Sequence, residues 1–166
     1  MPDDAAVLGQ VQAAFAQCER PEHFTDRNHC EECAEHDELL RSRVPDTLRI
    51  ADVANPGWDP LCYVDATGFG YFFPGLARLA LAAPDPEHGW YGSQLLYHLT
   101  YAPQGEANRH LEGFSPDQRR AVSALLRHID ATRQQLTEEW GCREELMHAI
   151  ALWSAEAEPR NAADSR

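Results

Sequence analysis

The sequence predicts an all-α fold, a single compact domain of five to six helices with at most one short pair of strands. Apolar residues recur at spacings of three and four along most of the chain, which is typical of helices that pack one face on a core. No repeat, long linker or change in composition divides the 166 residues, and one core can serve a chain of this length. We therefore expect one helical domain over residues 1–155, followed by a mobile tail over residues 156–166.

The first half of the chain contains two clear helix patterns and a long loop. The first helix is expected over residues 3–17, and the second begins at His29 and ends at about Ser42. The proline-rich segment 44–60 is expected to be a packed loop. Residues 61–64 follow as a short strand or a buried loop, because so short an apolar run fits either structure.

Four further helices are expected over residues 67–83, 90–101, 116–140 and 142–155. Pro74 should kink or restart the first of these helices. Ser115 and Pro116 form a strong start signal for the third, with a capping hydroxyl followed by proline at the first helical position. The expected core consists of Val11, Phe15, Phe72, Leu76, Leu79, Leu95, Leu99, Val122, Leu125, Ile129, Leu146 and Ile150.

The charge balance restricts the possible partners. Acidic residues outnumber basic ones 27 to 14, which gives a formal charge of −13, and every basic residue is arginine. Such a surface disfavours nucleic acid and anionic lipid and favours a basic protein partner. No apolar run approaches the roughly 20 residues of a membrane-spanning helix, and the acidic start lacks a signal-peptide pattern. We expect a cytoplasmic protein that binds neither nucleic acid nor membranes; its oligomeric state stays open.

The segment NHCEECAEHDELL, residues 28–40, concentrates the residue types that bind metals. On a helix each residue turns by about 100°, so His29, Cys30, Cys33 and His36 fall within one sector of roughly 120°. The glutamates at positions 31, 35 and 38 project from the opposite side, where water can solvate them. This separation of thiols and imidazoles from carboxylates indicates a binding face.

Thiolate and imidazole ligands together suit zinc. The sequence therefore predicts a non-catalytic zinc-binding domain whose ligands are His29, Cys30, Cys33 and His36. A single helix rarely offers four ligands in a tetrahedral array, so either the helix starts after His29, whose side chain then folds back, or another residue contributes. The candidates for that further ligand are His23, Asp37 and Cys62. Downstream residues such as Cys62, His98, Cys142 and His148 are otherwise isolated in the sequence.

Three alternatives to zinc remain open at this point. Cys30 and Cys33 could form a thiol–disulfide redox pair, with His36 as proton carrier, because a helix N-terminus lowers the pKa of a thiol. The chain could instead be an acidic antagonist that covers a basic partner. The cysteines could also be small buried hydrophobic residues without chemistry. Five cysteines without an export signal argue against a disulfide framework in every case.

Three segments together resemble a known family. They are HCEECAEHDE at 29–38, CYVDATGFGYFFPGLARLAL at 62–81 and FSPDQRRAVSALLRHI at 114–129. Their combination resembles an uncharacterised family of small bacterial proteins, a domain of unknown function, in which a Cys-x-Glu-Cys motif precedes an aromatic-rich helix interrupted by proline. The resemblance covers most of residues 10–130 and implies no activity.

Overall fold

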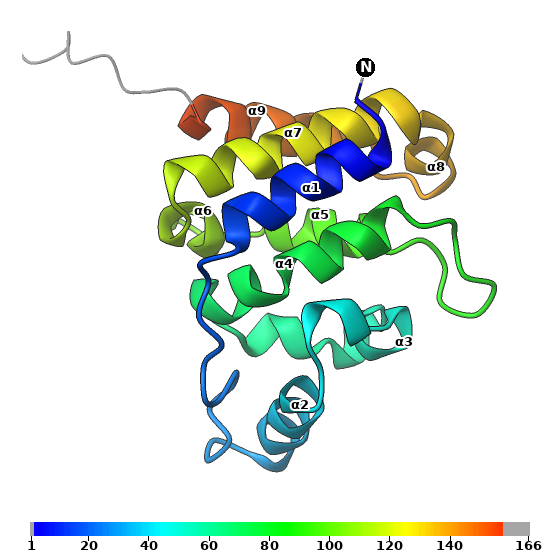
Figure 1. Ribbon diagram of the computed structural model, residues 1–166. Helices are drawn as coiled ribbons and strands as arrows, with labels where there is room; N and C mark the ends of the chain where they lie inside the picture. The colour runs from blue at the N-terminus through cyan, green and yellow to red at the C-terminus, as the bar shows by residue number, and fades with distance from the viewer. Residues whose placement is uncertain (1, 158–166) are drawn as a thin grey trace, which may run out of the picture.

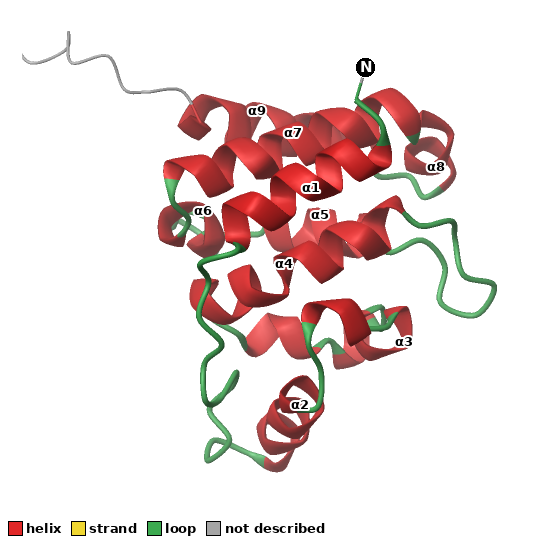
Figure 2. Cartoon of the chain, in the orientation of Figure 1, coloured by secondary structure: helices red, strands yellow, loops and turns green. Residues whose placement is uncertain are grey.

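The structure, a computed structural model, describes residues 2–157, and over that range it is all-α. Figure 2 shows helices and loops in this part of the chain and no strand; one isolated backbone bridge joins Asp85 and Gly89. The prediction of a compact all-α domain is confirmed. The helices are α1 (Asp4–Phe15), α2 (Glu31–Arg41), α3 (Ile50–Val53), α4 (Ala66–Leu81), α5 (Gly92–Thr100), α6 (Arg109–Gly113), α7 (Pro116–Thr132), α8 (Gln134–Glu139) and α9 (Arg143–Ala157).

The described residues contain more helices than the five to six expected, because short elements leave no periodic pattern. The helices α3 and α6 are too short to show a stripe of apolar residues. The helix expected over 116–140 divides at Arg133, whose backbone leaves the helical region (φ −123°, ψ 29°). In contrast, α4 continues through Pro74 without interruption.

Between the longer helices lie three 3-10 helices, η1 (Pro45–Thr47), η2 (Pro56–Trp58) and η3 (Pro60–Tyr63). The last shows that the apolar run at 61–64 forms a helical turn and not a strand, with Leu61 and Val64 buried and Tyr63 exposed. At the other end of the chain, α9 reaches Ala157. The predicted mobile tail therefore starts within α9, and its residues 158–166 lie outside the described residues.

The helices form a bundle with α2 at one end. α7 packs against α1 and α9, α1 also covers α4, and α5 contacts α4 and α9. In Figure 1, α2 lies at the end of the molecule opposite α9, and it contacts the bundle mainly through η3. The predicted core residues are buried except for Ile150, which packs against the core from its edge. No helix among the described residues has both the length and the apolar character needed to cross a bilayer.

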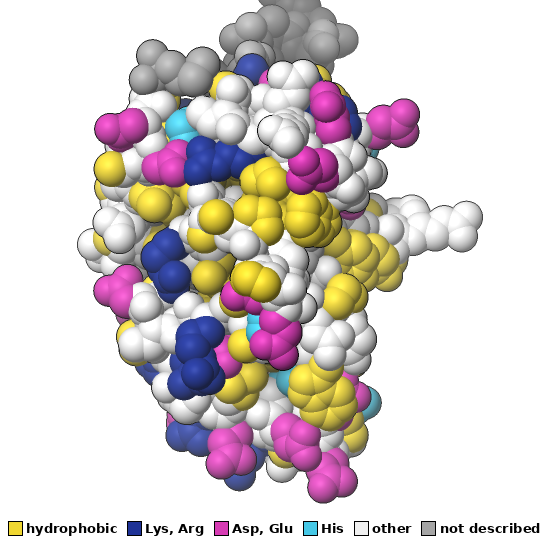
Figure 3. All heavy atoms as spheres, turned by 90° about the vertical axis from the view of Figure 1, so that its right-hand side faces the viewer, with side chains coloured by type: hydrophobic (Ala, Val, Ile, Leu, Met, Phe, Trp, Pro, Cys, Tyr) yellow, Lys and Arg dark blue, Asp and Glu magenta, His cyan; other side chains and the backbone are white. Residues whose placement is uncertain are grey.

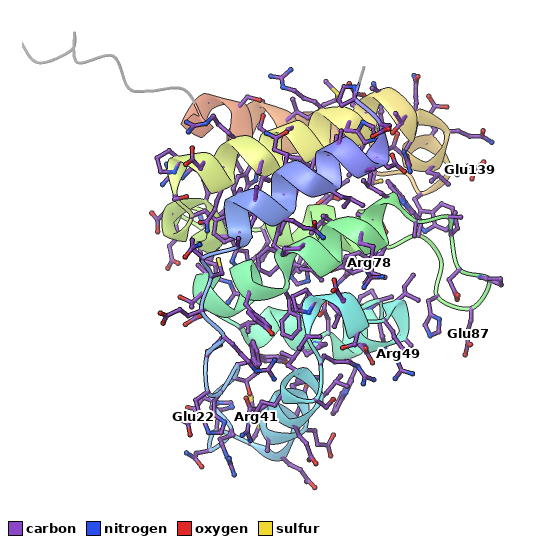
Figure 4. The ribbon with its side chains drawn as sticks, viewed as in Figure 1. Glu22, Arg41, Arg49, Arg78, Glu87 and Glu139 are labelled. Carbon is purple, nitrogen blue, oxygen red and sulfur yellow. The ribbon has the colours of Figure 1, made fainter. Side chains whose placement is uncertain are left out.

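Arginine side chains tie several of these elements together by donating to backbone carbonyls. Arg20 donates to the carbonyls of Arg41 and Arg43, Arg78 to those of Pro45 and Leu48, and Arg109 to those of Leu61 and Cys62. Figure 4 shows Arg78 on the side of α4 that faces the layer containing α3. Each planar guanidinium offers several N–H donors in fixed directions, so one side chain can serve two carbonyls.

The contact between α4 and η1 requires a glycine. A Cβ atom added at Gly75 would lie 2.5 Å from the carbonyl oxygen of Pro45, a backbone atom that cannot rotate away. At Gly9 in α1 an added Cβ would meet nothing within 4 Å. Gly75 therefore has no room for a side chain, whereas Gly9 does.

We expect Gly75→Ala to lower the free energy of unfolding by about 1–3 kcal/mol, because the added methyl group pushes η1 off α4. Gly9→Ala, the control, should raise it by about 0.5–1 kcal/mol, since alanine restricts the unfolded chain and favours the helix. Urea unfolding followed by circular dichroism measures both. A Gly75→Ala variant as stable as Gly9→Ala would contradict the close packing of α4 on η1.

The start of α1 is held to the far end of α7 by a charged cluster. Asp4 accepts hydrogen bonds from Arg133 (2.6 and 2.8 Å) and contacts the buried ring of His128 (2.6 Å). The Arg133 guanidinium, followed by His128, lowers the pKa of Asp4 from its ordinary value of 3.8 to about 2. Because the folded pKa lies below the unfolded one, this cluster stabilises the fold above pH 4 and loses its effect as the pH falls toward 2.

Asp4→Asn should lower the free energy of unfolding at pH 7 by about 1 kcal/mol, a value discounted because the carboxylate is partly exposed. The difference from the wild type should shrink as the pH falls below 4. Urea titrations between pH 7 and pH 3 measure it. Asp3→Asn is the matched control, because Asp3 caps α1 through Ala6 and asparagine caps equally well. A difference that does not change with pH would contradict the role of the Asp4 charge.

Candidate metal site at the start of helix α2

The candidate site is built around the first turn of α2. The helix begins at Glu31, two residues later than expected, and Cys30 is its N-cap residue with an extended backbone. The Cys30 sulfur accepts a hydrogen bond from the backbone N–H of Cys33 at 3.4 Å. His29 therefore precedes the helix, as one of the two alternatives for completing a tetrahedral site requires.

The segment before α2 is fixed to the helix by Asp37. This buried carboxylate accepts hydrogen bonds from the backbone N–H groups of Phe24 (2.7 Å) and Thr25 (3.4 Å) and contacts His23 Nδ1 at 2.7 Å. Burial opposes its ionisation, but these hydrogen bonds outweigh burial and lower the pKa of Asp37. The Thr25 hydroxyl also donates to the carbonyl of Cys33 (2.6 Å). In Figure 4 Glu22 marks this segment and Arg41 marks the end of α2.

A tight turn then brings His29 back over the helix. The backbone N–H of His29 donates to the carbonyl of Asp26 at 3.0 Å, and that of Asn28 donates to the Asp26 side chain at 3.1 Å. His29 Nδ1 comes to lie 3.6 Å from the sulfur of Cys33. One ligand atom from each of His29, Cys30 and Cys33 lies within 4.8 Å of the other two. Three of the four predicted ligands are thus together.

The fourth predicted ligand, His36, is not part of this group. Its ring is fully buried, 4.9 Å from the ring of Trp58 and stacked at 5.4 Å on that of Tyr63. His36 Nε2 lies 3.2 Å from a carboxylate oxygen of Glu32, which also accepts from the Tyr63 hydroxyl. His36 therefore joins α2 to η2 and η3, and it would have to leave these neighbours to approach the sulfur atoms.

The other candidates for a further ligand also lie elsewhere. His23 and Asp37 bind each other, as described above, and Cys62 is grouped with Asp59 and His98. The glutamates at positions 31, 35 and 38 are exposed, as expected from the helical pattern. Among the described residues, the ligands that lie together at this site are therefore one imidazole, His29, and two thiols, Cys30 and Cys33.

The two thiols differ in environment. The hydrogen bond from the Cys33 backbone, followed by the nearby His29, lowers the pKa of the Cys30 thiol. Burial raises the pKa of the Cys33 thiol, and the adjacent Cys30 adds to that effect. All five cysteines are free thiols, with Cys30 exposed and Cys33 buried. The surface thiol is thus the more acidic of the pair.

Sequence reasoning missed a second group of polar residues, formed by Asp59, Cys62 and His98. From the sequence, Cys62 is a candidate for the further ligand of the site at α2, His98 is an isolated histidine, and Asp59 is not a candidate ligand. The signal in the sequence is weak: Asp59 precedes a proline and stands three residues before Cys62, a spacing that a tight turn brings together. His98 follows 36 positions after Cys62 and is placed by tertiary packing alone.

Comparison of the chain with known protein families, with curated proteins and with solved structures finds no match. The resemblance to an uncharacterised bacterial family accordingly stays a prediction.

Proposed function

We propose that this protein is a non-catalytic zinc-binding protein whose ligands are His29, Cys30 and Cys33. The observation that carries the proposal is the approach of one imidazole nitrogen and two sulfur atoms to within 4.8 Å of one another at the start of α2. Thiolate and imidazole are the ligands that zinc prefers.

The distance between His29 and Cys33 fits a tetrahedral ion. Nitrogen and sulfur ligands at about 2.0 and 2.3 Å from one tetrahedral zinc ion lie about 3.5 Å apart. His29 Nδ1 and the Cys33 sulfur are 3.6 Å apart. Little movement of these two side chains is therefore needed to bind the ion. A fourth ligand, water or a donor from another molecule, completes the shell.

The location of the group favours a binding role over catalysis. His29 and Cys30 are exposed, so the ion would face bulk water, whereas metal-assisted chemistry relies on a shaped cavity that excludes it. Bound zinc would link the turn at Asp26–His29 to α2 and stabilise this end of the molecule, because a ligand that binds only the folded state adds to its stability. The role of His36 as a ligand stays a prediction that this proposal does not need.

Two other predicted functions have less support. A redox pair fits the lowered pKa of Cys30, but His36, the proton carrier expected for it, packs against Trp58 and Tyr63. An acidic antagonist of a basic partner would need a surface patch in which acidic side chains lie next to one another. On the face shown in Figure 3, acidic side chains lie among arginines and hydrophobic side chains.

The protein purified without an affinity tag should contain zinc, and Cys33→Ser should remove one equivalent of it, because one sulfur ligand is lost. Metal content is measured by inorganic mass spectrometry. A chelator should also make the thiols of Cys30 and Cys33 available to a thiol reagent. Cys18→Ser, which changes a cysteine outside the group, is the matched control and should leave the zinc content unchanged.

Cys30→Ser separates the two roles of Cys30. Serine is a strong N-cap residue, so the metal-free variant should be as stable as the metal-free wild type, while its zinc affinity falls. His36→Gln should retain zinc. Metal-free wild-type protein with a reversible Cys30–Cys33 disulfide would replace the proposal with redox chemistry. Metal-free protein with two inert thiols would leave the cysteines without a chemical role.

A further inference from the structure

A second group of possible ligands lies where η3 meets α5. Asp59 precedes η3 and Cys62 lies within it, while His98 comes from α5. One ligand atom from each of these residues lies within 4.8 Å of the other two. The Asp59 and His98 side chains are almost completely buried, and Cys62 is half-buried. This group shares no residue with the site at α2.

The carboxylate of Asp59 is held in place by neighbours that are not ligands themselves. The backbone N–H of Leu61 donates to Oδ1 (2.9 Å), and the side-chain amide of Gln94 donates to Oδ2 (2.6 Å). His98 Nε2 lies 2.7 Å from the same Oδ2. Outer hydrogen bonds of this kind orient the ligands of metal sites. The short contact between a histidine nitrogen and a carboxylate oxygen also holds a proton at a place where a metal ion can replace it.

One side of the group opens into a cavity of about 270 Å³. Cys62 and His98 form part of its wall, together with Tyr97, Tyr101 and His110. An ion bound by the three side chains would therefore be reached from this cavity. Metal sites with three protein ligands and one accessible position bind water or a small external ligand there.

Two buried polar atoms beside the group lack a partner among the described residues. They are the hydroxyl of Tyr91 and Nδ1 of His110, and both residues are only 1% exposed. Burial, followed by the charges of Asp59 and Cys62, raises the pKa of Tyr91. A buried polar atom without a hydrogen bond is rare in native proteins.

We propose that Asp59, Cys62 and His98 bind a second zinc ion whose open coordination position faces this cavity and takes water or a small anion. On binding, the ion replaces the proton held between His98 and Asp59 and the thiol proton of Cys62, and both protons pass to solvent. Sulfur, nitrogen and oxygen ligands in one site suit zinc and cobalt. The cavity limits the external ligand to a small molecule.

The test uses the full-length chain, without an affinity tag, in which Cys30 and Cys33 are both changed to serine so that the site at α2 is absent. Cobalt(II) is the probe, because its thiolate complexes absorb visible and near-ultraviolet light. The double variant should bind one cobalt ion with a sulfur-to-metal absorption band, and added azide should shift the visible bands by occupying the open position. X-ray absorption should find one sulfur ligand per cobalt.

Adding Cys62→Ser to the double variant should weaken cobalt binding more than the roughly 10–100-fold expected for loss of an outer hydrogen bond. Cys142→Ser in the same background is the matched control and should leave binding unchanged. Circular dichroism establishes that each variant is folded. No cobalt binding in the double variant, binding that survives Cys62→Ser, or a sulfur-free cobalt site would each overturn the proposal. Because the site at α2 is absent from these variants, the result does not depend on the proposed function.

Discussion

The buried carboxylate of Asp59 connects η3 to α5, and η3 in turn carries α2 at the end of the bundle. It accepts from the backbone of η3 through Leu61 and from α5 through Gln94, and it contacts His98. A buried charge is tolerated only when its hydrogen-bonding capacity is satisfied, so η3 and α5 must stay together for this side chain to remain inside. Since α2 contacts the bundle mainly through η3, the position of the candidate zinc site also depends on this carboxylate.

The sequence predicts the long helices well because each carries an apolar stripe that repeats over several turns. It does not predict α3 or α6, because elements this short have no period. It also does not predict the break at Arg133, the residue whose side chain binds distant Asp4. The same limit applies to the site. Local spacing brings His29, Cys30 and Cys33 together, whereas the position of His36 depends on Trp58 and Tyr63, more than 20 positions away. The group around Asp59 requires α5 to be packed and is not visible in any window of sequence.

The two ligand groups differ in how they relate to the fold. The first lies within five positions of the chain, with His29 and Cys30 exposed, and its ligands come from the turn before α2 and the first turn of that helix. The second spans η3 and α5 and is largely buried, so it exists only in the folded protein. An ion in the first group would order a local segment, whereas an ion in the second would reinforce the junction that Asp59 already makes.

The arginine contacts to backbone carbonyls have a consequence for alkaline solution. Lysine ammonium groups lose their protons near pH 10.4, whereas a guanidinium stays charged to well above pH 12. Because every basic residue of this chain is arginine, the ties made by Arg20, Arg78 and Arg109 keep their charge throughout that range. Between pH 8 and 12 the side chains left to lose protons are thiols and tyrosines, five of each, so the surface can gain negative charge while the arginine ties to backbone carbonyls stay intact.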